Sequence, residues 1–146
     1  MPILALPHAE EASSDPCDTG SELDILKSEF PDGVDFSLVP ERWTVHRGEF
    51  DVTVGALKAR AAKLRRWIRD RPEKEVVLVS HGFFNHYVTG DVDAEGNQTT
   101  GWWGEAECRT FQFKADGGED AEIVETEQSV NGREAIEGEG EKGTGA

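Results

Sequence analysis

The stretch from about residue 53 to residue 82 constrains the fold more than any other part of the chain. Residues 53–69 have apolar side chains at helical spacing, which predicts an amphipathic helix that Pro72 ends. The following run, EVVLVS over residues 75–80, is continuously apolar, which predicts a strand covered on both faces, as in a parallel sheet. A glycine turn at His81-Gly82 follows. A helix, a buried strand and a sharp turn in this order indicate an α/β fold.

Basic residues occupy the other faces of the predicted helix over residues 53–69. They are Lys58, Arg60, Lys63, Arg65, Arg66 and Arg69. Several of them lie near the helix C-terminus, where positive charge interacts favourably with the helix dipole. The simplest interpretation is therefore a solvated, basic helix face rather than a binding site.

Shorter elements flank this central unit. Residues 3–6 form a short apolar run that predicts a strand, and Ser21 can cap a helix that ends before Pro31. Residues 106–113 and 121–127 predict two strands joined as a hairpin. After about residue 128 the chain is rich in Glu and Gly and nearly free of large apolar side chains, which predicts a disordered acidic tail over residues 128–146.

Charge and length limit the classes of function. The chain has 146 residues, a length typical of one domain. Thirty acidic residues against fifteen basic ones give a formal net charge of −15. That charge argues against binding to nucleic acid or to an anionic membrane surface. It also repels phosphorylated molecules at long range, so any phosphate site needs locally concentrated positive charge.

The sequence predicts a cytoplasmic protein. It has two cysteines, Cys17 and Cys108, fewer than is usual in a small secreted scaffold held by disulfides, and we expect both to be reduced thiols. The apolar start over residues 1–7 lacks a basic segment and is soon followed by acidic residues, so it is a poor signal peptide. No run approaches the roughly 20 apolar residues that a membrane span needs.

His81 is the residue with the clearest potential for chemistry. It follows the predicted strand over residues 75–80, and ligands of open α/β sheets bind in the crevice at that edge. A histidine there can donate a hydrogen bond to a phosphate, or act as an acid or base near neutral pH. The alternative is a structural histidine that caps the next helix.

Known site motifs near His81 are absent. A nucleophile elbow needs the pattern G-x-S-x-G, whereas the central residue here is a histidine. His81 and His86 are five positions apart, not the four of a zinc-binding H-E-x-x-H helix, and the two cysteines have no zinc-finger spacing. The sequence therefore predicts no metal and no cofactor.

Four segments together resemble the fungal phosphoglycerate-mutase-like branch of the histidine phosphatases. They are residues 6–21 (LPHAEEASSDPCDTGS), 60–67 (RAAKLRRW), 79–89 (VSHGFFNHYVT) and 101–113 (GWWGEAECRTFQF). The third segment is the most specific, and the match covers residues 1 to about 127. The resemblance implies that residues 1–127 are the C-terminal part of a histidine-phosphatase domain. The expected fold is α/β, part of a three-layer α/β/α sandwich whose N-terminal portion is missing.

The resemblance also implies roles for individual residues. In this family one histidine attacks phosphorus and becomes a phosphohistidine, while further Arg and His side chains bind the phosphoryl oxygens. By this resemblance His81 is the second, phosphate-binding histidine, and Gly82 belongs to the same phosphate-binding motif. Glu11 resembles the acid/base that protonates the leaving oxygen, because it lies five residues before Pro16 in the Pro-Cys-Asp-Thr-Gly segment. Glu10 is the second choice for that role.

One expected motif is absent. The family's nucleophile lies in an Arg-His-Gly motif well before the acid/base, and the ten residues before Glu11 include no arginine. His8 is neither preceded by Arg nor followed by Gly, so it cannot replace that motif. We therefore expect a truncated phosphomonoester hydrolase that is inactive alone and would take a small phosphorylated substrate only if the missing half completed it. The alternative is a non-catalytic remnant that acts as a binding protein. The oligomeric state stays open.

Overall fold

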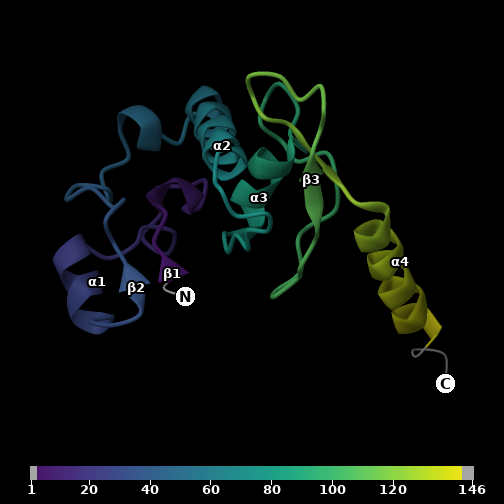
Figure 1. The fold of residues 1–146 in the computed structure, drawn as a ribbon, viewed down its shortest axis with the longest axis horizontal. Helices are drawn as coiled ribbons and strands as arrows, with labels where there is room; N and C mark the ends of the chain where they lie inside the picture. The colour runs from purple at the N-terminus through teal and green to yellow at the C-terminus, as the bar shows by residue number, and fades with distance from the viewer. Residues whose placement is uncertain (1–2, 143–146) are drawn as a thin grey trace.

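The computed structural model describes residues 3–142. Helices α2 and α3 lie together in the middle, α1, β1 and β2 lie on one side of them, and β3 and α4 lie on the other (Figure 1). In chain order the elements are β1 (Ile3–Leu4), the 3-10 helix η1 (Pro7–Ala9), α1 (Leu23–Glu29), β2 (Val34–Asp35), the 3-10 helix η2 (Gly48–Phe50), α2 (Val54–Arg69), α3 (Gly82–Thr89), β3 (Phe111–Phe113), β4 (Ile123–Glu125) and α4 (Glu127–Lys142).

The hydrophobic core lies where α2 meets α3 and the segment around η1. Its buried members are Ala9, Ala12, Leu57, Ala61, Leu64, Phe84, Tyr87 and Val88. The predicted helix over residues 53–69 is confirmed as α2, and the Thr53 hydroxyl accepts a hydrogen bond from the Ala56 N–H at its start. Burial of the apolar stripe of α2 is the main stabilising contribution here, since helices in water depend on such packing.

The strands are short and form two separate sheets. β1 pairs with β2 in parallel, and β3 pairs with β4 as the antiparallel hairpin that the sequence predicts. About 34% of the residues are helical and 9% are in strands, so the mixed α/β composition is confirmed. Within residues 3–142 these two-stranded sheets do not form the middle layer of a sandwich.

Residues 75–80 differ from the prediction of a buried strand. They belong to no helix or strand, and the side chains of Val77 and Val79 are 89% and 85% exposed. Leu78, which points the other way, packs against the core of α2 and α3. The physical reason is that no described strand lies beside this segment and no described layer covers its outer face. Its composition is that of a buried strand, but its surroundings are not.

Two of the six bases expected on the solvated face of α2 are buried instead. Arg60 is 1% exposed and Arg65 is 8% exposed. The Arg65 guanidinium donates to the carbonyl oxygens of Tyr87, Val88 and Asp120, and it thereby ties α2 to the end of α3 and to the β3–β4 loop. The expectation of a solvated face is wrong for Arg60 and Arg65, because both project toward carbonyl groups that would otherwise be buried without partners.

Helix α4 occupies most of the tail that the sequence predicts to be disordered. The structure has a helix over Glu127–Lys142, although the sequence predicts disorder over residues 128–146; residues 143–146 of that tail lie outside the described residues. The first turns are held by local contacts. The Thr126 hydroxyl accepts from the Ser129 N–H, and the Glu125 carboxylate accepts from the Ser129 hydroxyl and from Arg133. These contacts supply the cap that composition alone does not reveal.

Candidate functional site

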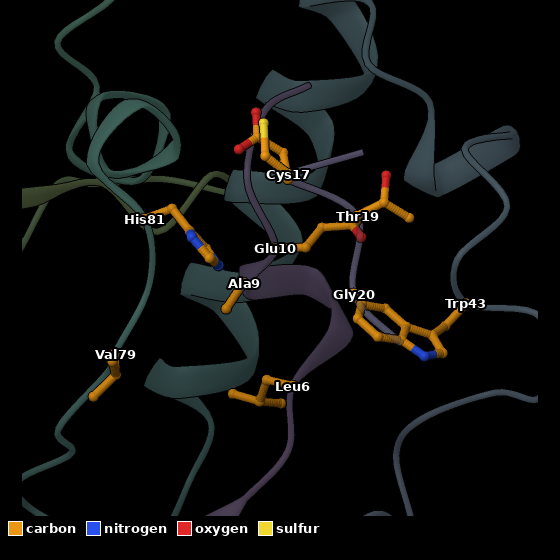
Figure 2. A pocket seen from close by; sticks show the side chains of 10 residues that line it. Leu6, Ala9, Glu10, Cys17, Thr19, Gly20, Trp43, Val79 and His81 are labelled. Atoms are coloured by element: carbon orange, nitrogen blue, oxygen red, sulfur yellow. The ribbon is translucent and has the colours of Figure 1, made fainter. Parts of the chain in front are cut away.

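A pocket of about 260 Å³ lies between η1, the loop after it and the segment that leads into α3 (Figure 2). It is lined by Leu6, Ala9, Glu10, Cys17, Asp18, Thr19, Gly20, Trp43, Val79 and His81. Nine of these ten residues belong to the segments 6–21 and 79–89, which are two of the four segments that carry the family resemblance. Two regions some 60 residues apart in the chain therefore meet at one site.

His81 reaches this pocket from the extended segment that precedes α3. It occupies the N-cap position of α3, but its side chain makes no capping hydrogen bond. In Figure 2 the imidazole extends toward Ala9 at the edge of the pocket. The structural alternative, a histidine whose side chain caps the helix, does not describe this conformation. The ring is left available to a ligand.

Glu10 supplies a carboxylate to the same pocket. Its Oε1 accepts a hydrogen bond of 2.7 Å from Arg60 Nη1, and its side chain is only 5% exposed. Its Oε2 is buried and has no hydrogen-bond partner among the described residues; His46 Nε2 lies 3.9 Å away. Burial raises the pKa of Glu10 to about 7, and the Arg60 charge opposes that rise without cancelling it. A carboxyl that titrates near neutral pH can both give and take a proton.

Arg60 fixes the position of the Glu10 carboxylate and of the backbone beside it. Its Nη2 donates to the carbonyl oxygens of Glu10 and Glu11, at 3.1 Å and 2.9 Å. The guanidinium also lies over the Phe84 ring, 4.3 Å from the centroid. Because its donors are directed at Glu10, Glu11 and the core, Arg60 has no exposed surface to offer an anionic ligand in the pocket.

Glu11 does not line this pocket, and its side chain is at the start of α3. Its carboxylate accepts hydrogen bonds from the backbone N–H groups of Ala12, Phe83 and Phe84, at 2.7, 3.3 and 2.8 Å. It thus satisfies the free N–H groups at the start of α3, where a negative charge is also favoured by the helix dipole. The structure places Glu10, rather than Glu11, in the lining of the pocket that contains His81.

Gly82 begins α3 beside His81. A Cβ atom added there would meet nothing within 4 Å, and its φ is not positive. Gly20, by contrast, lines the pocket at a place where a side chain would overlap the Trp43 ring. The close backbone approach in this site is therefore at Gly20, beneath Trp43.

Of three residues that contribute to the site and were not predicted as site residues, only Arg60 has a local sequence signal. Arg60 lies on the apolar side of α2, one turn from Leu57 and Leu64, so its helical position could have indicated burial. Trp43 donates from its indole N–H to the Ser21 carbonyl oxygen and closes one wall of the pocket. His46, in contrast, approaches Glu10 from an irregular segment, and no pattern in the sequence indicates that contact.

A second hollow of about 440 Å³ lies between the end of α3 and the β3–β4 hairpin. Three cations line it, but each has a carboxylate partner: Arg109 pairs with Glu107, Lys114 with Glu122, and Arg133 with Glu125. The charges of these three cations are therefore already balanced. The smaller pocket is the better candidate site, because Glu10 Oε2 has no hydrogen-bond partner there among the described residues and the His81 side chain makes no capping hydrogen bond.

The comparisons with known proteins add no relative. No protein-family model matches the chain, and no curated protein or solved structure is significantly similar to it. Within residues 3–142 no group of three or more His, Cys, Asp or Glu side chains could hold a metal ion. In the same part of the chain, no helix combines the length and the apolar character that a membrane crossing needs.

Proposed function

We propose that the pocket is part of a phosphomonoester site of the histidine-phosphatase type, in a chain that has no turnover alone. The observation that carries this proposal is the convergence of residues 6–20 with Val79 and His81 on one pocket. These are the two stretches that contain the acid/base and the phosphate-binding histidine by resemblance. The same proposal includes a phosphoglycerate-mutase-like sandwich as the parent fold and a cytoplasmic location, which the two free cysteines favour.

In this proposal His81 and Glu10 have separate roles. The His81 imidazole donates a hydrogen bond to a phosphoryl oxygen, where negative charge increases in the transition state. Glu10, with its pKa near 7, is partly protonated at neutral pH and can protonate the leaving oxygen. Arg60 and His46 act as positioning residues for that carboxyl. Glu11 keeps the first turn of α3 in place and so acts on His81 only through the backbone.

The pocket lacks the cations that a phosphate dianion needs. None of its ten lining residues is Lys or Arg, whereas Glu10 and Asp18 are acidic. The net charge of −15 adds long-range repulsion. This deficit supports weak binding and no turnover, and it also supports the second candidate function, a non-catalytic protein that binds a partner through this region.

Binding of phenyl phosphate tests the proposed site. We expect weak, millimolar binding that shifts the backbone amide NMR signals of Thr19 and Gly20 in the pocket at pH 6.5, because one imidazole and no arginine contact the ligand. The shift should be lost in His81→Ala. It should remain in His8→Ala, because His8 contacts Glu49 and Phe50 rather than the pocket. Equal shifts in wild type and His81→Ala, or none at 50 mM ligand, would rule the site out.

Hydrolysis of an aryl phosphate should not be measurable with the purified chain. Direct attack of water on a phosphomonoester is extremely slow, and a covalent phosphohistidine requires a nucleophile held in line with the leaving oxygen. His81 has no cation beside it to hold the phosphoryl group in that line. Phosphate release should therefore equal that of the His81→Ala control. Turnover above this control would make His81 a nucleophile and would contradict the proposal of an inactive chain.

A further inference from the structure

The extended segment over residues 75–80 is apolar, exposed and unpaired. No backbone hydrogen bond joins residues 75–80 to any described residue. One side of the segment is anchored, because Leu78 packs on the core of α2 and α3 and the Ser80 hydroxyl donates to the Ala9 carbonyl oxygen at 2.7 Å. The other side presents Val77 and Val79 to solvent. Isolated exposed valines are ordinary, but two on one strand-like segment with free N–H and C=O groups form a template for pairing.

A second open edge lies on β1. The N–H groups of Ile3 and Ala5 donate to the carbonyl oxygens of Gly33 and Asp35 in the β2 region, each at 2.9 Å. Because successive N–H groups of a strand point to opposite edges, the N–H of Leu4 faces away from β2, and no described residue accepts from it. Leu6 at the end of this edge and Val79 in the other segment line the same pocket (Figure 2). Both open edges therefore end at the same pocket, the one that contains His81.

Charge distinguishes between possible occupants of these edges. A second copy of the chain would bring another net charge of −15, which repels. At the pocket, where both edges end, the lining contains no Lys or Arg, and Asp18 is an acid with no cationic partner among the described residues, whereas Arg60 balances the charge of Glu10. An apolar strand that is followed by basic residues is complementary both to the exposed Val77 and Val79 and to the acidic Asp18 in the pocket.

We propose that this surface, formed by residues 75–80 and the free edge of β1, binds an extended apolar segment of another protein that adds as a β-strand. In such an addition, main-chain hydrogen bonds supply affinity and the flanking side chains supply specificity. The partner's apolar side chains cover Val77 and Val79, and its basic residues lie at the pocket beside Asp18.

Binding of labelled synthetic peptides to the full chain tests this proposal. The probe has three Thr-Val repeats followed by two arginines; the matched peptides end in two glutamates, or carry a proline in the middle of the repeats. By fluorescence anisotropy we expect the arginine peptide to bind at least ten-fold more tightly than either of the others. Proline removes a main-chain donor, and glutamates meet the acidic pocket. Hydrogen exchange should show new protection at the amides of residues 76–79 when the first peptide is bound.

The double variant Val77→Lys/Val79→Lys tests whether the peptide binds at residues 75–80. Both side chains are exposed, so the substitutions leave the core intact, and affinity for the arginine peptide should fall at least ten-fold. The control Ile25→Lys/Leu38→Lys changes the net charge equally at two other exposed apolar residues and should leave the affinity within about two-fold. Equal losses in both variants, or no preference between the peptides, would overturn the proposal. A homodimer that dissociates in the Val77→Lys/Val79→Lys variant would overturn it in favour of a second copy.

Discussion

Replacement of Arg60 by alanine is expected to lower the free energy of unfolding by about 3–5 kcal/mol at pH 8. Arg60 is fully buried and donates to the Glu10 carboxylate and to the carbonyl oxygens of Glu10 and Glu11. Without it, a buried carboxylate and two carbonyl groups lose their partner in a place that water cannot easily reach. The variant also loses the packing of the guanidinium over the Phe84 ring.

Urea unfolding followed by circular dichroism measures this loss. The matched control is Lys63→Ala, which removes another base of α2 from a pair with Glu49 in which both side chains are about half exposed. Such a pair is expected to contribute less than about 1 kcal/mol. A loss in Arg60→Ala no larger than in Lys63→Ala would show that the buried cluster is not formed in solution. At pH 5 the loss in Arg60→Ala should be smaller than at pH 8, because Glu10 can then bind a proton.

Glu10 is expected to make the chain less stable as the pH rises. Its pKa is about 7 in the folded state and about 4.5 in the unfolded chain, so between these values the folded state holds the extra proton. The contribution of Glu10 to the free energy of unfolding is therefore fully present below pH 4.5, and it is lost as the pH rises through 7. A shift of this size corresponds to about 3 kcal/mol over the whole interval.

The Glu10→Gln variant isolates this effect. Burial lowers the pKa of His8 and of His86, and these two groups make stability rise with pH over part of the same interval. The difference between wild type and Glu10→Gln cancels their contribution. We expect that difference to change by about 3 kcal/mol between pH 4.5 and pH 8, whereas Glu41→Gln at the surface should track wild type. A difference that stays constant with pH would mean that Glu10 titrates normally.

Elements with local signals can be predicted from the order of residues alone. The spacing of Leu57, Ala61 and Leu64 predicts α2, and Thr53 marks its start. The hairpin of β3 and β4 follows from two apolar runs joined by a glycine turn. Residues 6–21 and 79–89, which carry part of the family resemblance, supply nine of the ten residues that line the pocket, but the meeting of these two segments is a tertiary contact. Features such as α2 and the hairpin depend on neighbours within one or two turns of the chain, so the printed order of residues contains the information they need.

Tertiary contacts determine which groups share the pocket and which become buried. Glu10 and Glu11 are adjacent and chemically alike, yet one faces the pocket with His81 and the other binds the first N–H groups of α3. Arg60 is buried because the backbone near Glu10 passes over α2, some 50 residues away in sequence. Residues 75–80 carry the composition of a covered strand but have no cover within residues 3–142. Burial, charge pairing and strand pairing depend on what approaches from elsewhere, and the spacing of nearby residues does not contain that information.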